Sequence, residues 1–138
     1  MKSLISRTKI RVRFSEVDSM GIAWHGSYVK YLEDGREAFG REFNFGYMDV
    51  FNKGFFTPIV KMELDYKLPL RYEDEAIIET KYISNDAAKI IFEYKIFSVD
   101  NKLLARAKTI QVFVNISGDL QLSTPDFFID WKKKFNLI

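Results

Sequence analysis

The stretch from Asp18 to Tyr28 brings together residue types that could act on a carbonyl group. It holds the carboxylate of Asp18, the only histidine of the chain, His25, and two glycines, Gly21 and Gly26, directly before a segment with helical periodicity. The first turn of a helix has unpaired backbone N–H groups and a partial positive charge, which suit a carbonyl oxygen or an oxyanion. A carboxylate seven residues before His25 could attack that carbonyl or activate water.

Other signatures of catalysis are missing from the sequence. It has no G-x-S-x-G, P-loop, G-x-G-x-x-G or H-E-x-x-H pattern, so serine-triad hydrolysis and nucleotide chemistry are not favoured. Without cysteine there can be no thiol nucleophile, disulfide or cysteine-ligated metal, and one histidine excludes a multi-histidine metal site. We therefore expect neither a metal nor a cofactor.

The element that must position this stretch is an amphipathic helix over residues Ser27 to Phe43. Apolar residues recur there at spacings of three and four, and charged residues occupy the other side. Ser27 is the expected N-cap. Two internal glycines each cost a helix about 1 kcal/mol relative to alanine, so they call for a reason. We interpret Gly35 as a site of close approach by another backbone, and Gly40 as a tolerated change on the polar side.

The rest of the chain is typical of strands joined by short turns. Alternation of apolar and polar residues predicts strands over Lys9 to Phe14 and over 58–67, 76–84, 89–99, 103–117 and 120–122, with a hairpin at Asp100 and Asn101. Thr124 as cap and Pro125 at the first position predict a terminal helix. The order favours an α+β fold in which an antiparallel sheet curves around one long helix, and residues 1–138 are expected to form a single domain.

Composition narrows the class of protein. In 138 residues, 47% are hydrophobic and 29% charged, which is ordinary for a globular protein. The charged residues, with a net charge of +2, are spread along the chain, so we expect no nucleic-acid partner. No long apolar run occurs, so we expect no membrane span. A cytoplasmic protein is the expectation that follows. The thirteen Phe, seven Tyr and two Trp indicate an aromatic core, an oligomer interface or an apolar ligand site.

The run DSMGIAWHGSYVKYLEDGR resembles the signature of hot-dog thioesterases of the 4-hydroxybenzoyl-CoA thioesterase and YbgC type. The matching positions are Asp18, Gly21, Trp24, His25, Gly26, Tyr28, Tyr31, Glu33 and Arg36, with weaker matches at Asp65, Tyr66, Pro69, Tyr72 and Asp74. The order of elements fits over nearly the whole chain. Ser27 stands where the family usually has Asn, and Gly35 where a small residue such as Ala is commoner.

This resemblance implies a hot-dog fold, hydrolysis of acyl-CoA thioesters and a homodimer or homotetramer. It implies that Asp18 is the catalytic carboxylate and His25 a second site residue, with backbone N–H groups near His25 and Gly26 binding the thioester carbonyl. Substrate contacts are expected from Trp24, Gly26, Ser27 and Tyr28.

Several alternatives stay open on the sequence. Asp18 could be a nucleophile or a general base, and the protein could be a non-catalytic acyl-CoA or lipid binder or, less favoured, an acyl-thioester hydratase or dehydratase. Trp24, Tyr28 and Tyr31 are most simply interpreted as core or interface aromatics. Glu33 and Arg36 are expected to form a structural ion pair. Candidate cations for the CoA phosphates are Lys89, Lys95, Arg106 and Lys108.

Overall fold

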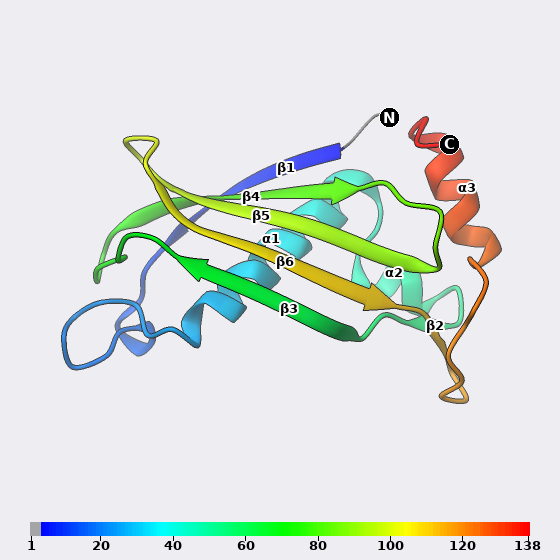
Figure 1. The fold of residues 1–138 in the computed structure, drawn as a ribbon, viewed down its shortest axis with the longest axis horizontal. Coiled ribbons are helices and arrows are strands. Elements are labelled where there is room, and N and C mark those ends of the chain that lie inside the picture. The colour runs from blue at the N-terminus through cyan, green and yellow to red at the C-terminus, as the bar shows by residue number, and fades with distance from the viewer. Residues whose placement is uncertain (1–3) are drawn as a thin grey trace.

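A computed structural model describes residues 4–138, which form a five-stranded antiparallel sheet in the order β1-β4-β5-β6-β3. Its strands are β1 (Leu4–Arg11), β3 (Ile59–Tyr66), β4 (Glu75–Ile83), β5 (Lys89–Ser98) and β6 (Leu103–Val112). Hairpin-length turns join β4 to β5 and β5 to β6, so consecutive strands lie side by side (Figure 1). The predicted α+β arrangement, with a curved antiparallel sheet around one long helix, is confirmed.

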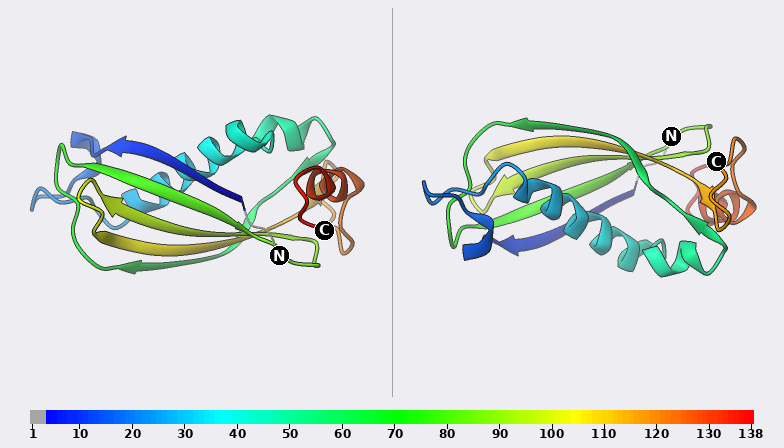
Figure 2. Two further views of the ribbon diagram at one scale, coloured as in Figure 1. Left: turned by 90° about the horizontal axis from the view of Figure 1, so that it is seen from above. Right: turned by 90° about the horizontal axis from the view of Figure 1, so that it is seen from below.

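Helix α1 (Ser27–Phe43) lies along the inner face of this sheet, as the two side views in Figure 2 show. Its bounds are those that the apolar spacing predicts. Tyr31, Leu32 and Phe39 on its inner side are almost completely buried. The helix ends at Asn44, whose left-handed backbone (φ 55°) reverses the chain.

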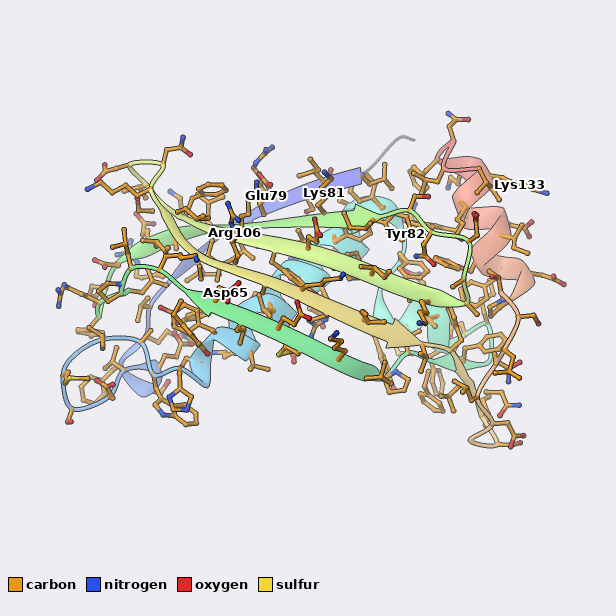
Figure 3. All side chains as sticks on the ribbon, viewed as in Figure 1. Asp65, Glu79, Lys81, Tyr82, Arg106 and Lys133 are labelled. Carbon is orange, nitrogen blue, oxygen red and sulfur yellow. The ribbon has the colours of Figure 1, made fainter. Side chains whose placement is uncertain are left out.

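Strand alternation separates the two faces of the sheet. In β4 the buried residues are Ala76, Ile78, Thr80 and Tyr82, which face α1, and the residues between them are partly exposed. Charged side chains on the outer face include Asp65, Glu79, Lys81 and Arg106 (Figure 3). Register places Asp65 beside Arg106, and Arg7 beside Glu79, with which it forms an ion pair of 2.9 Å. The outer face is therefore polar, while the core lies between α1 and the inner face.

Smaller elements lie at the end of the sheet near the C-terminal end of α1 (Figure 1). They are α2 (Tyr47–Phe51), β2 (Phe55–Phe56), β7 (Val114–Asn115) and α3 (Asp126–Lys134). Trp131 of α3 stacks with Phe128 at 5.7 Å between ring centroids and lies 4.7 Å from the ring of Phe45. Many of the aromatic side chains thus pack α3 against this end of the core.

Three strand predictions were wrong in their bounds. The first strand is described over Leu4–Arg11 rather than Lys9 to Phe14, because the chain then enters the 3-10 turn η1 (Phe14–Glu16), which leaves Phe14 77% exposed. The long strand predicted over 103–117 is divided into β6 and β7 at Phe113, and only Leu120 of the segment 120–122 forms a bridge, to Val114. The terminal helix starts one residue later than expected, with Pro125 as its N-cap.

The glycines of α1 also differ from expectation. At Gly35 an added Cβ would lie 2.4 Å from Thr80 Oγ1 and 2.9 Å from Ile78 Cγ2, so a close approach is confirmed, although side chains of β4 make it rather than backbone. The interpretation of Gly40 as a tolerated change was wrong. Gly40 is buried, and a Cβ there would lie 2.7 Å from Gly46 Cα, because the chain folds back after Asn44.

Candidate active site

Asp18 lies in a tight turn between η1 and α1. Its N–H donates to Ile22 O at 2.9 Å, its carbonyl accepts from Gly21 N–H at 3.0 Å, and its Oδ1 accepts from Met20 N–H at 2.8 Å. Gly21 has φ +76°, which L side chains rarely adopt, so glycine suits this turn. Within residues 4–138, Asp18 Oδ2 has no hydrogen-bond partner. One carboxylate oxygen is thus fixed by a backbone N–H, and the other is unpaired in the described residues.

Glu16, which the sequence analysis did not single out, ties this loop to the helix. Its side chain is almost completely buried and accepts hydrogen bonds from Arg13 N–H at 2.8 Å and Tyr31 OH at 3.0 Å, and it also pairs with Lys30 Nζ. Burial alone would raise the pKa of Glu16, but the hydrogen bonds from Lys30, Arg13 and Tyr31 together outweigh it and hold the pKa below its ordinary value. Glu16 is therefore ionised at neutral pH.

Ser27 does not cap the helix, contrary to prediction. Gly26 is the N-cap residue, and the Ser27 hydroxyl donates to Glu16 O at 2.8 Å. The Ser27 N–H donates to Trp24 O at 2.8 Å, so it is not free for a ligand. The N–H groups of His25 and Gly26 have no hydrogen-bond partner in the described part of the chain. Two of the donors expected at the helix start therefore remain available.

A pocket of about 300 Å³ adjoins these groups. It is lined by Asp18, Ile22, Ala23, His25, Tyr28, Tyr66, Lys67, Leu68 and Pro69. The structure thus brings together Asp18, His25 and Tyr28, as predicted for the site. Burial raises the pKa of the Tyr28 hydroxyl, which is therefore neutral at ordinary pH.

Tyr66, the last residue of β3, and Lys67 directly after it complete the pocket and were missed as site residues. Tyr66 OH donates to His25 O at 3.0 Å, and its ring meets that of Tyr28 edge-on at 4.9 Å. This hydrogen bond fixes the loop that carries the free N–H groups. Tyr66 belongs to the weaker part of the family resemblance, which was the one signal that could have found it.

The other predicted substrate-binding residues do not line this pocket. Trp24 is 52% exposed, and its ring lies against His25 at 4.6 Å between centroids. The same ring covers Gly26, because a Cβ at Gly26 would lie 2.0 Å from Trp24 Cζ3. Trp24, Gly26 and Ser27 therefore border the site without forming its wall.

The expected ion pair between Glu33 and Arg36 does not form. Arg36 Nη1 instead donates to Tyr94 OH at 3.1 Å beneath the sheet, because Tyr94 projects from β5 toward α1. Glu33 and Arg36 line a second pocket, of about 520 Å³, nearer the far end of α1.

The cations proposed for CoA phosphates do not lie at the Asp18 pocket. Lys95, Arg106 and Lys108 line a hollow on the outer face of the sheet, together with carboxylates of Glu63, Asp65, Glu79 and Glu93. Lys89 starts β5 and does not line the Asp18 pocket either. The cation that lines the pocket is Lys67.

The sequence model of the thioesterase-like superfamily matches residues 12–132. The chain belongs to this thioesterase-like superfamily. YneP of Bacillus subtilis, which carries the name acyl-CoA thioesterase, is 30% identical over 127 residues, or 92% of each chain. The acyl-CoA thioester hydrolase YbgC of Escherichia coli is 27% identical over 115 residues, covering 83% of this chain and 86% of that one.

Solved structures of thioesterases share the fold. The DHNA-CoA thioesterase of Staphylococcus aureus superimposes with a TM-score of 0.85 at 22% identity, over 96% of this chain and 89% of that one. Membership of the thioesterase-like superfamily agrees with a pocket lined by the carboxylate Asp18 and by His25, whose N–H has no hydrogen-bond partner in residues 4–138. No group of three or more potential metal-ligating side chains occurs in residues 4–138. In the same range no helix is long and apolar enough to span a membrane.

Proposed function

We propose that residues 1–138 act as one domain that hydrolyses acyl-CoA thioesters to a free acid and CoA at the Asp18 pocket. The observation that carries the proposal is the shared position of Asp18 and His25 in the wall of one pocket beside the start of α1. The names of the relatives YneP and YbgC support an acyl-CoA substrate.

In the proposed mechanism the N–H groups of His25 and Gly26 bind the thioester oxygen. There they stabilise the negative charge that develops as the carbonyl becomes tetrahedral. The partial positive charge of the α1 N-terminus acts in the same direction. Tyr66 contributes by fixing the His25 carbonyl and thereby the loop that holds these donors.

Asp18 Oδ2 then supplies the reacting group by one of two routes. As a nucleophile it adds to the carbonyl carbon and expels CoA thiolate, giving a mixed anhydride that water hydrolyses. As a general base it takes a proton from water, whose oxygen adds to the carbon before CoA thiolate leaves. Both routes need one carboxylate oxygen free, and the Met20 N–H fixes only Oδ1.

We also propose that two chains pair through β3. This strand is one edge of the sheet, and six of its eight residues are exposed, including Val60 at 59%. A free, exposed edge strand tends to pair with another strand. The charged residues of the opposite edge, β1, are all basic (Arg7, Lys9 and Arg11) and would repel a copy of themselves, whereas β3 carries charges of both signs (Lys61, Glu63 and Asp65).

Antiparallel pairing of β3 with its copy would unite the two pockets. Tyr66 at the end of β3 lines the Asp18 pocket, whereas Ile59 at its start lines the larger pocket. Two antiparallel copies place the end of one strand beside the start of the other. Each Asp18 pocket would then open toward the larger pocket of the partner subunit, as expected for an interfacial site.

The test is incubation of purified protein with a panel of acyl-CoAs and a thiol-detecting reagent. Release of free CoA supports the proposal. A changed acyl chain that stays attached to CoA would indicate a hydratase or dehydratase, and binding without reaction would indicate a carrier, so either result contradicts it.

A further inference from the structure

The larger pocket, of about 520 Å³, lies between α1 and the inner face of β5 and β6. Its walls are mainly apolar and include the rings of Phe45, Tyr47, Phe56 and Phe92. Such walls suit the apolar body of a small ligand. Polar side chains interrupt this surface, namely those of Glu33, Arg36, Glu37, Thr57 and Gln111.

Gln111 is 9% exposed and has an unused acceptor. Its Nε2 donates to Thr57 O at 2.8 Å, which fixes the orientation of the amide, since only the nitrogen can donate to a carbonyl. Its Oε1 is shut off from solvent and has no hydrogen-bond partner in residues 4–138. Buried polar atoms are rarely left unpaired, so this oxygen calls for a donor.

Arg36 has unused donors at the same pocket. It is half-buried, its Nη1 donates to Tyr94 OH at 3.1 Å, and no carboxylate of the described chain lies within 4.0 Å of it. Tyr94 OH is held in turn by Thr109 Oγ1 at 2.6 Å. Thr109 and Gln111 are two residues apart on the inner face of β6, about 7 Å along the strand. Arg36 is thereby anchored one step along the sheet from Gln111.

We propose that this pocket receives the far end of the acyl group and that Gln111 and Arg36 select a hydroxyl there. A hydroxyl group can donate to an acceptor such as Gln111 Oε1 and can accept from a guanidinium such as that of Arg36, so its chemistry matches both side chains. An alkyl or unsubstituted aryl end leaves Oε1 unpaired. A carboxylate cannot donate to Oε1, and Glu33 and Glu37 beside Arg36 repel it. The inference rests on the proposed function and on the β3 pairing that joins the two pockets.

The experiment compares matched substrates with and without the hydroxyl. The pairs are 6-hydroxyhexanoyl-CoA with hexanoyl-CoA, and 4-hydroxybenzoyl-CoA with benzoyl-CoA. We expect kcat/KM of the wild-type protein to favour the hydroxylated member of at least one pair by about tenfold or more, because sites built to bind a hydroxyl reject analogues that lack it. In Gln111→Met, which keeps the side-chain length but has no acceptor oxygen, that ratio should fall to about one.

The matched control is Gln121→Met, the same change outside the pocket. It should leave the ratio as in the wild type. If Gln111 acts only as a latch for Thr57, Gln111→Met will lower the melting temperature and slow both members of each pair equally. That result would overturn the inference. So would a wild-type protein without preference in either pair, or a ratio unchanged in Gln111→Met.

A binding measurement separates this inference from the proposed function. Calorimetric titration of the same CoA pairs into Asp18→Asn and into Asp18→Asn/Gln111→Met needs no turnover. Tighter binding of the hydroxylated member that disappears with Gln111→Met supports the inference even if the wild-type protein releases no CoA. Equal affinities for both members of each pair would contradict it, whatever the activity.

Discussion

Two carboxylates only two residues apart, Glu16 and Asp18, have opposite surroundings. Glu16 is 5% exposed and surrounded by donors from Arg13, Lys30 and Tyr31. Asp18 is half-buried, lines a pocket and keeps one oxygen without a partner in residues 4–138. The first arrangement stabilises the loop, and the second leaves one carboxylate oxygen unpaired, as the proposed hydrolysis requires. At the scale of residues, structure and chemistry are thus divided between two neighbouring acids.

Replacement of Glu16 by glutamine should lower stability in a pH-dependent way. Because the folded pKa of Glu16 lies below its ordinary value of 4.5, its ionised form stabilises the fold above that pH, and the contribution is lost as pH falls through the folded pKa. We expect Glu16→Gln to cost about 1–3 kcal/mol at pH 7 and less below pH 4.5. Chemical denaturation at several pH values measures this, with the exposed Glu42→Gln as control. A difference from wild type that stays constant or grows toward low pH would refute the assignment.

The sequence predicted Asp18 and His25 because their types and spacing precede a helix that periodicity also predicts. It could not predict Glu16 as an anchor, since an acid in a loop is ordinarily solvated and its burial depends on Tyr31 and Lys30 of α1. Tyr66 was not predicted as a site residue because its contact with His25 joins residues 41 positions apart. The N-cap prediction for Ser27 failed because the Glu16 carbonyl takes up its hydroxyl.

At the scale of elements, two glycines of α1 allow neighbouring segments to pack closely against the helix. Gly35 lets β4 approach, and Gly40 lets the chain pass back over the helix at Gly46. Both cost intrinsic helix stability, and both let neighbouring segments pack more closely than a Cβ allows.

Gly40→Ala should therefore destabilise the protein despite the higher helix propensity of alanine. The added Cβ would lie 2.7 Å from Gly46 Cα, and relieving that overlap by backbone shifts costs about 1–3 kcal/mol. Thermal unfolding should show a lower melting temperature for Gly40→Ala and little change for the control Glu37→Ala at an exposed position of the same helix. An equal or higher melting temperature in Gly40→Ala would mean that the close approach of Gly46 to Gly40 does not contribute to stability.

At the scale of the whole molecule, the two edges of the sheet are unlike. Alternation within each strand and short turns made the antiparallel sheet predictable, but no local pattern indicated that β3 pairs with β6 and lies at an edge. That position follows from the path of the chain around α1. It leaves an exposed edge strand between the two pockets and provides the basis for the proposed dimer.

Light scattering at micromolar concentration should give twice the chain mass of 16.2 kDa or a multiple of it. Val60→Lys, at an exposed position of β3, should shift the protein toward monomer and reduce CoA release, because buried unpaired charge opposes strand pairing. Ile5→Lys, at an exposed position on the opposite edge strand, should keep the wild-type mass. A wild-type protein that is monomeric, or a Val60→Lys variant with unchanged mass, would rule out pairing through β3.

The most direct test of the account is the rate of CoA release by Asp18→Asn. Asparagine keeps the size of the side chain and an oxygen for the Met20 N–H, but it removes the charge that attacks the carbonyl or activates water. We predict that hydrolysis falls by about a hundredfold or more, while circular dichroism and melting temperature stay close to those of the wild type. A folded Asp18→Asn protein that retains wild-type hydrolysis would contradict the assignment of Asp18 as the reacting carboxylate.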